Sequence, residues 1–305
     1  MAGRLRQTAA LAALAVVPLV VAPTAGAAAT PHQTPATSGY WLESGDGGVF
    51  AFGAAPFFGS SVGRCSLSCY GFAALPDGTG YRVLDAGLTT AKAALYGFGA
   101  AADATLSEPA DAWFPVAVAS TPSGDGGWVL YGDGGAVQAF NNARFYGDGS
   151  NLGRVEYGQD PYGVMPYFVG IAPTPDGGGY WLAGADGGVF AYGDAAFYGS
   201  MGGRHLNAPV VGISATPDGR GYYLVAMDGG VFAFGDAVFA GSMAGRHLNE
   251  VMISIAANPT GVGYWTAAQD GGVFTFGGAP FSGSMGGEHL NRPVYNIVAY
   301  RTALT

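Results

Sequence analysis

Short apolar and aromatic runs alternate with glycine-rich turns along most of the chain. The clearest run reads Asp-Gly-Gly-Val-Phe-Ala/Thr-Phe/Tyr-Gly and occurs four times, at 46–53, 186–193, 228–235 and 270–277. Each copy follows a glycine and two aromatic residues, as in the Gly-Tyr-Trp-Leu run at 179–182. The last three of these aromatic runs begin 42 residues apart, and a period of this length is typical of a propeller or a solenoid.

A single repeat predicts four short antiparallel strands. In the repeat that begins at residue 209, apolar stretches at 209–215 and 222–227 flank a Thr-Pro-Asp-Gly turn, where proline sets φ and glycine supplies positive φ. An Asp-Gly-Gly hairpin leads into a third strand at 231–235, and a short fourth strand is expected at 238–242. Four short antiparallel strands in one repeat are typical of one propeller blade. The density of glycine, β-branched and aromatic residues excludes a helical solenoid.

The number of repeats predicts how the fold closes. Copies of the second strand begin near six glycines, Gly39, Gly80, Gly127, Gly179, Gly221 and Gly263. No first strand precedes the first copy, and an unpaired first strand at 294–300 follows the last. The predicted fold class is therefore all-β, a six-bladed β-propeller of four-stranded antiparallel blades. We expect the ring to close by pairing of 294–300 with 40–44, which would remove exposed sheet edges.

Neighbouring aromatic residues predict a core between blades. Tyr180 and Trp181 point to opposite faces of their strand, because strand side chains alternate. A blade packed between two others buries both faces, so we interpret these pairs as inter-blade core in preference to a stacking site.

Residues 1–29 are predicted to be a secretory signal peptide that is removed on export. They carry two arginines and no acid, an apolar stretch at 11–21, and two alanine-rich sites that fit the cleavage rule equally well. The apolar stretch is shorter than the ~20 residues of a membrane span, so no span is expected after cleavage. A polar linker follows at 30–38, and the propeller is predicted at 39–305.

Predicted export also favours one interpretation of the two cysteines, Cys65 and Cys69. A local structural disulfide is the natural interpretation in an exported protein. The alternative is a metal-binding or redox pair, but no further Cys or His lies between Ser60 and Asp77.

Composition narrows the classes of partner. The chain has 305 residues, of which 54 are glycine, and its net charge is −9. The glycines have no three-residue period, so the chain is not collagen-like. A hydrophobic fraction of 49% argues against disorder. Because cations are few, nucleic acid and anionic membranes are not expected partners.

The repeat resembles a known family. Units such as the one that begins at Gly179, Gly-Tyr-Trp-Leu-Ala-Gly-Ala-Asp-Gly-Gly-Val-Phe-Ala-Tyr-Gly-Asp, resemble those of secreted bacterial propeller-like repeat proteins. Their layout is also similar to the repeats of the regulator of chromosome condensation, with Phe52, Tyr192, Phe234 and Phe276 where that family has tryptophan. The resemblance covers residue 39 to about 300, is weak near 80–111, and implies a propeller. It implies no catalytic residue.

Repeated polar residues do not predict a metal site or a cofactor. His205, His247 and His289 lie 42 residues apart, but equivalent positions on neighbouring blades are at least ~10 Å apart, whereas zinc binds nitrogen at ~2.1 Å. The Asp-Gly-Gly aspartates are better explained as turn residues than as calcium ligands. No nucleophile elbow, zinc-protease motif or phosphate loop occurs.

The predicted recognition site is an insertion in the third repeat, at 148–166. Hairpins and blade-crossing loops share one end of a propeller, so one distinct loop among near-identical ones is where we expect binding. The predicted ligand-binding residues are Tyr146, Asp148, Arg154, Glu156, Tyr157, Asp160 and Tyr162.

These observations predict a secreted, monomeric, non-enzymatic module, extracellular or associated with the cell wall, that binds a cell-wall glycan or a surface protein. The alternative is an extracellular carbohydrate-active enzyme, a hydrolase or lyase, that uses acids at the same end, with Glu156 and Asp160 as the first pair to test. A purely structural surface module is the third possibility.

Overall fold

The computed structural model of the chain describes residues 38–301 apart from 66–67, 88–92, 108–113 and 153–166. The described residues form nineteen strands and no helix. No segment among them is therefore a helix of the length and hydropathy that would cross a membrane.

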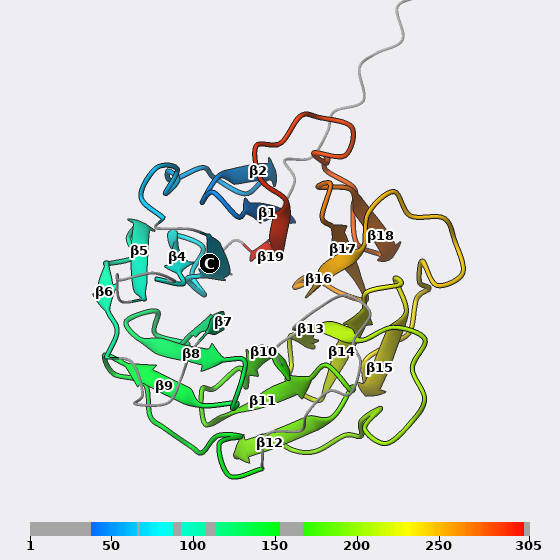
Figure 1. The fold of residues 1–305 in the computed structure, drawn as a ribbon, viewed down its shortest axis with the longest axis horizontal. Helices are drawn as coiled ribbons and strands as arrows, with labels where there is room; N and C mark the ends of the chain where they lie inside the picture. The colour runs from blue at the N-terminus through cyan, green and yellow to red at the C-terminus, as the bar shows by residue number, and fades with distance from the viewer. Residues whose placement is uncertain (1–37, 66–67, 88–92, 108–113, 153–166, 302–305) are drawn as a thin grey trace, which may run out of the picture. The chain divides into compact units, whose positions relative to one another are not determined.

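The strands form six antiparallel sheets, which we number in chain order (Figure 1). Sheets 1 to 3 are β19 (Val294–Arg301), β1 (Ser38–Ser44) and β2 (Val49–Gly53); β3 (Cys69–Ala74), β4 (Gly80–Asp85), β5 (Ala94–Gly99) and β6 (Ala104–Thr105); and β7 (Pro115–Ser120), β8 (Gly127–Tyr131) and β9 (Val137–Phe140). Sheets 4 to 6 are β10 (Phe168–Pro173), β11 (Gly179–Gly184) and β12 (Val189–Gly193); β13 (Val210–Ala215), β14 (Gly221–Ala226) and β15 (Val231–Gly235); and β16 (Met252–Ala257), β17 (Gly263–Ala268) and β18 (Val273–Gly277).

The middle strand of every sheet is buried on both faces, as the aromatic pairs predict. All residues of β11 and β14 are buried, for example. Tyr180 of β11 packs against Trp128 of sheet 3, with ring centroids 5.5 Å apart, and Trp181 packs against Tyr222 of sheet 5 at the same distance. The core thus lies between sheets, which explains why the strands lack polar alternation.

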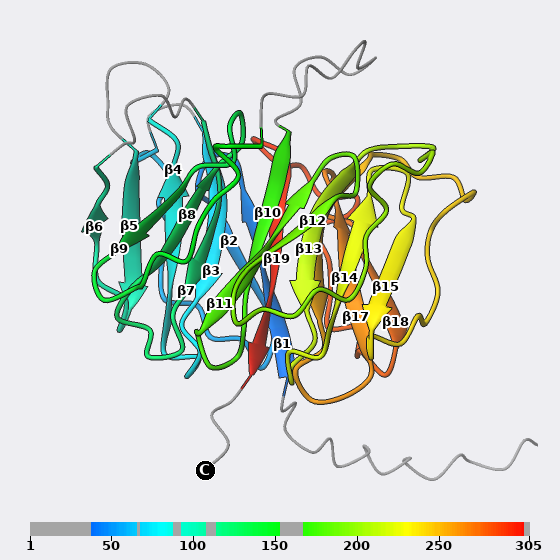
Figure 2. The ribbon, with the colours of Figure 1, turned by 90° about the horizontal axis from the view of Figure 1, so that it is seen from below.

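The first strands of the sheets, which we call the inner strands, lie side by side in chain order. β3 contacts β7, which contacts β10, and the series continues through β13 and β16 to β19, which in turn contacts β3. Figure 1 shows these strands nearest the common centre and the last strand of each sheet outermost, and Figure 2 shows them from the side.

The predicted pairing of the two ends of the repeat region is confirmed. β19 pairs with β1 in antiparallel register, with Tyr40 opposite Ala299 and Ser44 opposite Val294. Sheet 1 therefore contains strands from both ends of the described chain.

The prediction of four strands per sheet is wrong for five of the six sheets within the described residues. Only sheet 2 has a fourth strand, the short β6. The segments that follow the other third strands each begin with a turn and belong to no sheet, and we call them straps: 54–60, 141–147, 194–200, 236–242 and 278–284.

A tyrosine explains why the strap at 236–242 is not a strand. The Tyr264 hydroxyl, from the middle strand of the next sheet, accepts from the Ala240 amide and donates to the Gly241 carbonyl. Backbone groups held by a side chain cannot join a ladder. Gly241 also has φ of 126° and lies over the Phe276 ring, which only glycine allows easily.

Candidate binding site at the hairpin end

The inner strands enclose a cavity of about 720 Å³. Its lining comes from β3, β7, β10, β13, β16 and β19 and their neighbouring turns. Among the described residues that line it, none carries a charge, and the polar contribution comes from a few serines, threonines, tyrosines and two amides. A cavity of this size with mostly apolar walls is typical of a site for an uncharged ligand.

One end of the cavity, the hairpin end, lies where the inner strands begin. The first residue of β10, Phe168, pairs with Gly184, beside the hairpin that joins β11 to β12. The Asp-Gly-Gly turns lie at this end, and Asp186 accepts the Gly188 amide at 2.8 Å. The aspartates therefore do act as turn residues, as the sequence predicts.

Three aromatic side chains line the cavity at its hairpin end. The second residue of an inner strand is Val or Ile in sheets 3 to 6, but it is Tyr70 in β3 and Tyr295 in β19. The ring centroids of Tyr70 and Tyr295 lie 4.8 Å apart, and Phe114, just before β7, lies 5.0 Å from Tyr70. We call Tyr70, Phe114 and Tyr295 the aromatic wall. All three are half-buried and line the cavity.

A buried acid and an amide lie directly behind the aromatic wall. Glu43 of β1 is fully buried and pairs in register with Asn296 of β19. The Asn296 Nδ2 donates to Glu43 Oε2 at 2.9 Å and to the Tyr70 carbonyl at 3.1 Å. Glu43 Oε1 has no hydrogen-bond partner within the described part of the chain.

Glu43 departs from the pattern of the repeats. The matching residues of the other middle strands are all apolar: Leu84, Leu130, Ala183, Val225 and Ala267. Burial raises the pKa of the Glu43 carboxyl well above its usual range, the hydrogen bond from Asn296 opposes this, and the nearby Asp46 adds to it. Burial likewise raises the pKa of Tyr295 to about 12, with a further contribution from Tyr70.

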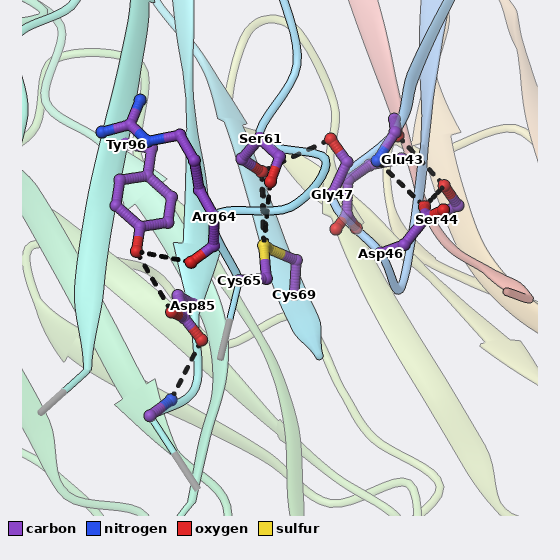
Figure 3. Close-up of a disulfide and its surroundings, with 12 residues drawn as sticks. Glu43, Ser44, Asp46, Gly47, Ser61, Arg64, Cys65, Cys69, Asp85 and Tyr96 are labelled. Carbon is purple, nitrogen blue, oxygen red and sulfur yellow. Dashed lines mark hydrogen bonds between the residues drawn. A yellow bond between two sulfur atoms is a disulfide. The ribbon is translucent and has the colours of Figure 1, made fainter. Parts of the chain in front are cut away.

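A disulfide anchors the strand that carries Tyr70. Cys65 and Cys69 are bonded, with Cα atoms 5.9 Å apart, so the predicted disulfide is confirmed. Cys69 is the first residue of β3 and precedes Tyr70. Figure 3 shows the Ser61 hydroxyl facing the disulfide, 3.3 Å from the Cys65 sulfur. The bridge thus ties the segment before β3 to the mouth of the cavity.

Charged and polar side chains surround Arg64, which precedes Cys65 in the chain. Arg64 stacks on the Tyr96 ring, with its guanidinium 4.0 Å from the centroid, and it pairs with Asp103 at 3.2 Å. The Tyr96 hydroxyl in turn donates to Asp85 at 3.2 Å (Figure 3). Arg64 and Asp103 are exposed, so this pair contributes little to stability.

The structure places two of the predicted ligand-binding residues. Tyr146 belongs to a strap and donates its hydroxyl to the Gly177 carbonyl at 2.7 Å. The Asp148 carboxylate accepts from the Ser150 amide at 3.1 Å, and its backbone carbonyl accepts from the Tyr192 hydroxyl at 2.7 Å. Both residues are half-buried, and their contacts explain them as parts of the fold. Their role in binding stays a prediction.

The other five predicted residues, Arg154, Glu156, Tyr157, Asp160 and Tyr162, lie outside the described residues. The three repeated histidines, His205, His247 and His289, are exposed, each in its own crossing segment. Among the residues that the structure describes, no group of three or more His, Cys, Asp or Glu side chains is placed to hold a metal ion.

Sequence reasoning missed the aromatic wall, Glu43 and Asn296. A signal was present for Tyr70, Tyr295, Glu43 and Asn296, because each breaks the repeat at a fixed position. Tyrosine stands in place of Val or Ile, glutamate in place of an apolar residue, and asparagine in place of Gly, Ala or Ser. Aligning the inner and middle strands position by position would have found them. Comparison of the chain with protein-family models and with curated proteins returned no match.

Proposed function

We propose that the six sheets are the blades of a closed β-propeller, and that the protein is a secreted, non-enzymatic module that binds through the hairpin end. The pairing of β19 with β1 and the contact of β19 with β3 support closure. The signal-like residues 1–29 support export.

The aromatic wall is the observation that carries the binding proposal. The second residue of the inner strand is Val or Ile in four of the six sheets, whereas β3 and β19 carry tyrosine there and Phe114 lies just before β7. Rings from three adjacent inner strands or their flanking residues therefore line the cavity together. Half-exposed aromatic rings beside a cavity are characteristic of recognition surfaces. The uncharged lining favours a neutral ligand, and we propose a cell-envelope glycan or an uncharged patch of a surface protein.

Replacement of the two tyrosines by the residue of the other repeats tests this proposal. The double variant Tyr70→Val/Tyr295→Val should retain its melting temperature to within a few degrees and lose roughly 5- to 150-fold in affinity, since two ring contacts contribute ~0.5–1.5 kcal/mol each. Binding is measured on a glycan array and against envelope extracts fractionated into glycan and protein.

The matched control is Phe197→Ala, which removes an exposed ring far along the chain from the mouth. It should bind like the native protein. Equal binding by native protein and the double variant would contradict the site. A further variant, with 148–166 replaced by the shorter crossing segment of the next repeat, tests the predicted insertion. Unchanged binding would rule out a role for that segment.

A further inference from the structure

The orientation of Asn296 determines what the mouth can offer a ligand. Both amide hydrogens of Asn296 are engaged inside the protein, one by Glu43 Oε2 and one by the Tyr70 carbonyl. A carbonyl can only accept, so the amide cannot be reversed without losing that bond. The Asn296 Oδ1 is the polar atom that remains.

The Asn296 oxygen is open to the cavity. Asn296 lines the cavity, and within the described residues its Oδ1 accepts no hydrogen bond and is not among the buried atoms that lack a partner. It therefore presents a fixed acceptor and no donor at the mouth. An acceptor held in place before binding loses little entropy when a donor arrives.

Glu43 supports this arrangement in its neutral form. Its Oε1 is buried without a partner, and an ionised carboxylate in that position would carry a large desolvation cost. The neutral carboxyl still accepts from Asn296 through Oε2. It adds no charge to the mouth, in keeping with the uncharged lining.

We infer that the aromatic wall and Asn296 form a binding site for an uncharged ligand that combines an apolar face with a hydroxyl or N–H donor. The apolar face would pack on Tyr70, Phe114 and Tyr295, and the donor would bond to Asn296 Oδ1. The inference rests on the proposed function, because it names the chemical class of ligand that the hairpin end takes. Anionic and cationic ligands are disfavoured, since none of the lining residues that the structure describes compensates a charge.

Three probes with one apolar body test the inference on the whole protein: 1-naphthylmethanol, its methyl ether and 1-naphthalenesulfonate. Isothermal titration should show the alcohol binding at one site per chain. The ether, which cannot donate, should bind about tenfold more weakly, the usual effect of one hydrogen bond. The sulfonate should show no saturable binding.

The variant Glu43→Leu/Asn296→Ala is matched to the fold, since sheet 3 already carries Leu130 opposite Ala117 at this position. It should bind the alcohol as weakly as the ether and leave the ether unchanged. Glu43→Gln, which keeps an acceptor for Asn296, should retain the preference for the alcohol. Phe197→Ala, which removes an exposed ring, should change nothing.

Three results would overturn the inference: no saturable binding of the alcohol, sulfonate binding equal to that of the alcohol, or a preference for the alcohol that survives in the double variant. The two experiments together distinguish failure of this inference from failure of the proposed function. If the alcohol binds as described and the glycan array and envelope fractions show nothing, the site stands and the biological ligand is of another uncharged class.

Discussion

At the scale of single residues, Glu43 is the clearest departure from the repeat. A folded-state pKa above the unfolded value means that the folded protein keeps a proton that the unfolded chain has released. The contribution of this group to stability is therefore greatest below ~4.3, the ordinary pKa of glutamate. It decreases as pH rises through the folded-state pKa. Glu43 thus destabilises the fold at neutral and alkaline pH.

Glu43→Gln should raise the melting temperature at pH 8 by a few degrees, at ~2–4 °C per kcal/mol, and have no effect at pH 4. The physical reason is that glutamine makes the same bond with Asn296 without a group that can ionise. Thermal unfolding by circular dichroism from pH 4 to pH 9 measures it. Glu288→Gln, at an exposed position, is the control. A difference in melting temperature between Glu43→Gln and the native protein that stays constant from pH 4 to pH 9 would contradict a raised pKa of Glu43.

At the scale of elements, hydrogen bonds that recur from sheet to sheet stand in place of the missing fourth strands. In five sheets a tyrosine of the middle strand bonds to the strap of the preceding sheet: Tyr40, Tyr81, Tyr180, Tyr222 and Tyr264. In sheet 3 the matching position is Gly127, which pairs with Phe140 where Tyr180 pairs with Tyr192. The preceding sheet 2 is the one with a fourth strand, so within the described residues the strand forms where the tyrosine is absent.

In sheet 2, Arg82 supplies a hydrogen bond to the neighbouring sheet 3. Arg82 stands at a position where other sheets carry a tryptophan. The indole of that tryptophan donates to the strap of the same sheet, as Trp181 does to the Ala196 carbonyl at 2.8 Å. The Arg82 Nε donates to the Ala102 carbonyl at 3.3 Å, and Nη2 donates to the Gly124 carbonyl of sheet 3 at 2.8 Å. One buried guanidinium thus bonds within its sheet and to the next.

Tyr222→Phe should destabilise the protein by ~1–3 kcal/mol, because it leaves the Tyr198 amide and the Gly199 carbonyl without partners. Hydrogen exchange should increase at residues 195–202 and little elsewhere. Tyr223→Phe, which removes a single 3.3 Å bond to Val238 in its own sheet, should have a smaller effect. Equal melting temperatures for Tyr222→Phe and the native protein would show that the strap is held by packing alone.

At the scale of the whole molecule, the seam between β1 and β19 connects the two ends of the repeat region. It buries Tyr40, Leu42, Val294 and Ile297 in one cluster with residues of sheet 6. Trp41 packs against Tyr300 across the seam, with ring centroids 5.2 Å apart. In the proposed propeller this seam is the closure, so the stability of all six sheets depends on it.

Deletion of residues 293–305 should therefore abolish cooperative unfolding or lower the melting temperature by well over 10 °C, since the loss of a buried strand removes several kcal/mol at ~2–4 °C each. The exposed β1 edge should also promote aggregation, which size-exclusion chromatography would detect. Deletion of 302–305 alone, which leaves β19 complete, is the control. A stable, monomeric 293–305 deletion would contradict closure.

The repeat determines much of this protein by itself. Period, strand order and the Asp-Gly-Gly and Pro-Asp-Gly turns follow from local pattern and turn chemistry. The number of repeats predicts the pairing of 294–300 with 40–44, and the signal-like N-terminus favours the disulfide. Tertiary structure decided the rest. The strap at 236–242 has the apolar character of a strand, but the Tyr264 hydroxyl competes for its backbone groups. Tyr70 and Tyr295 form one wall because β3 and β19 become neighbours, and the pKa of Glu43 is raised chiefly because both faces of β1 are buried. The sequence shows that these positions depart from the repeat, but only contacts between distant segments and their burial decide what the departures form.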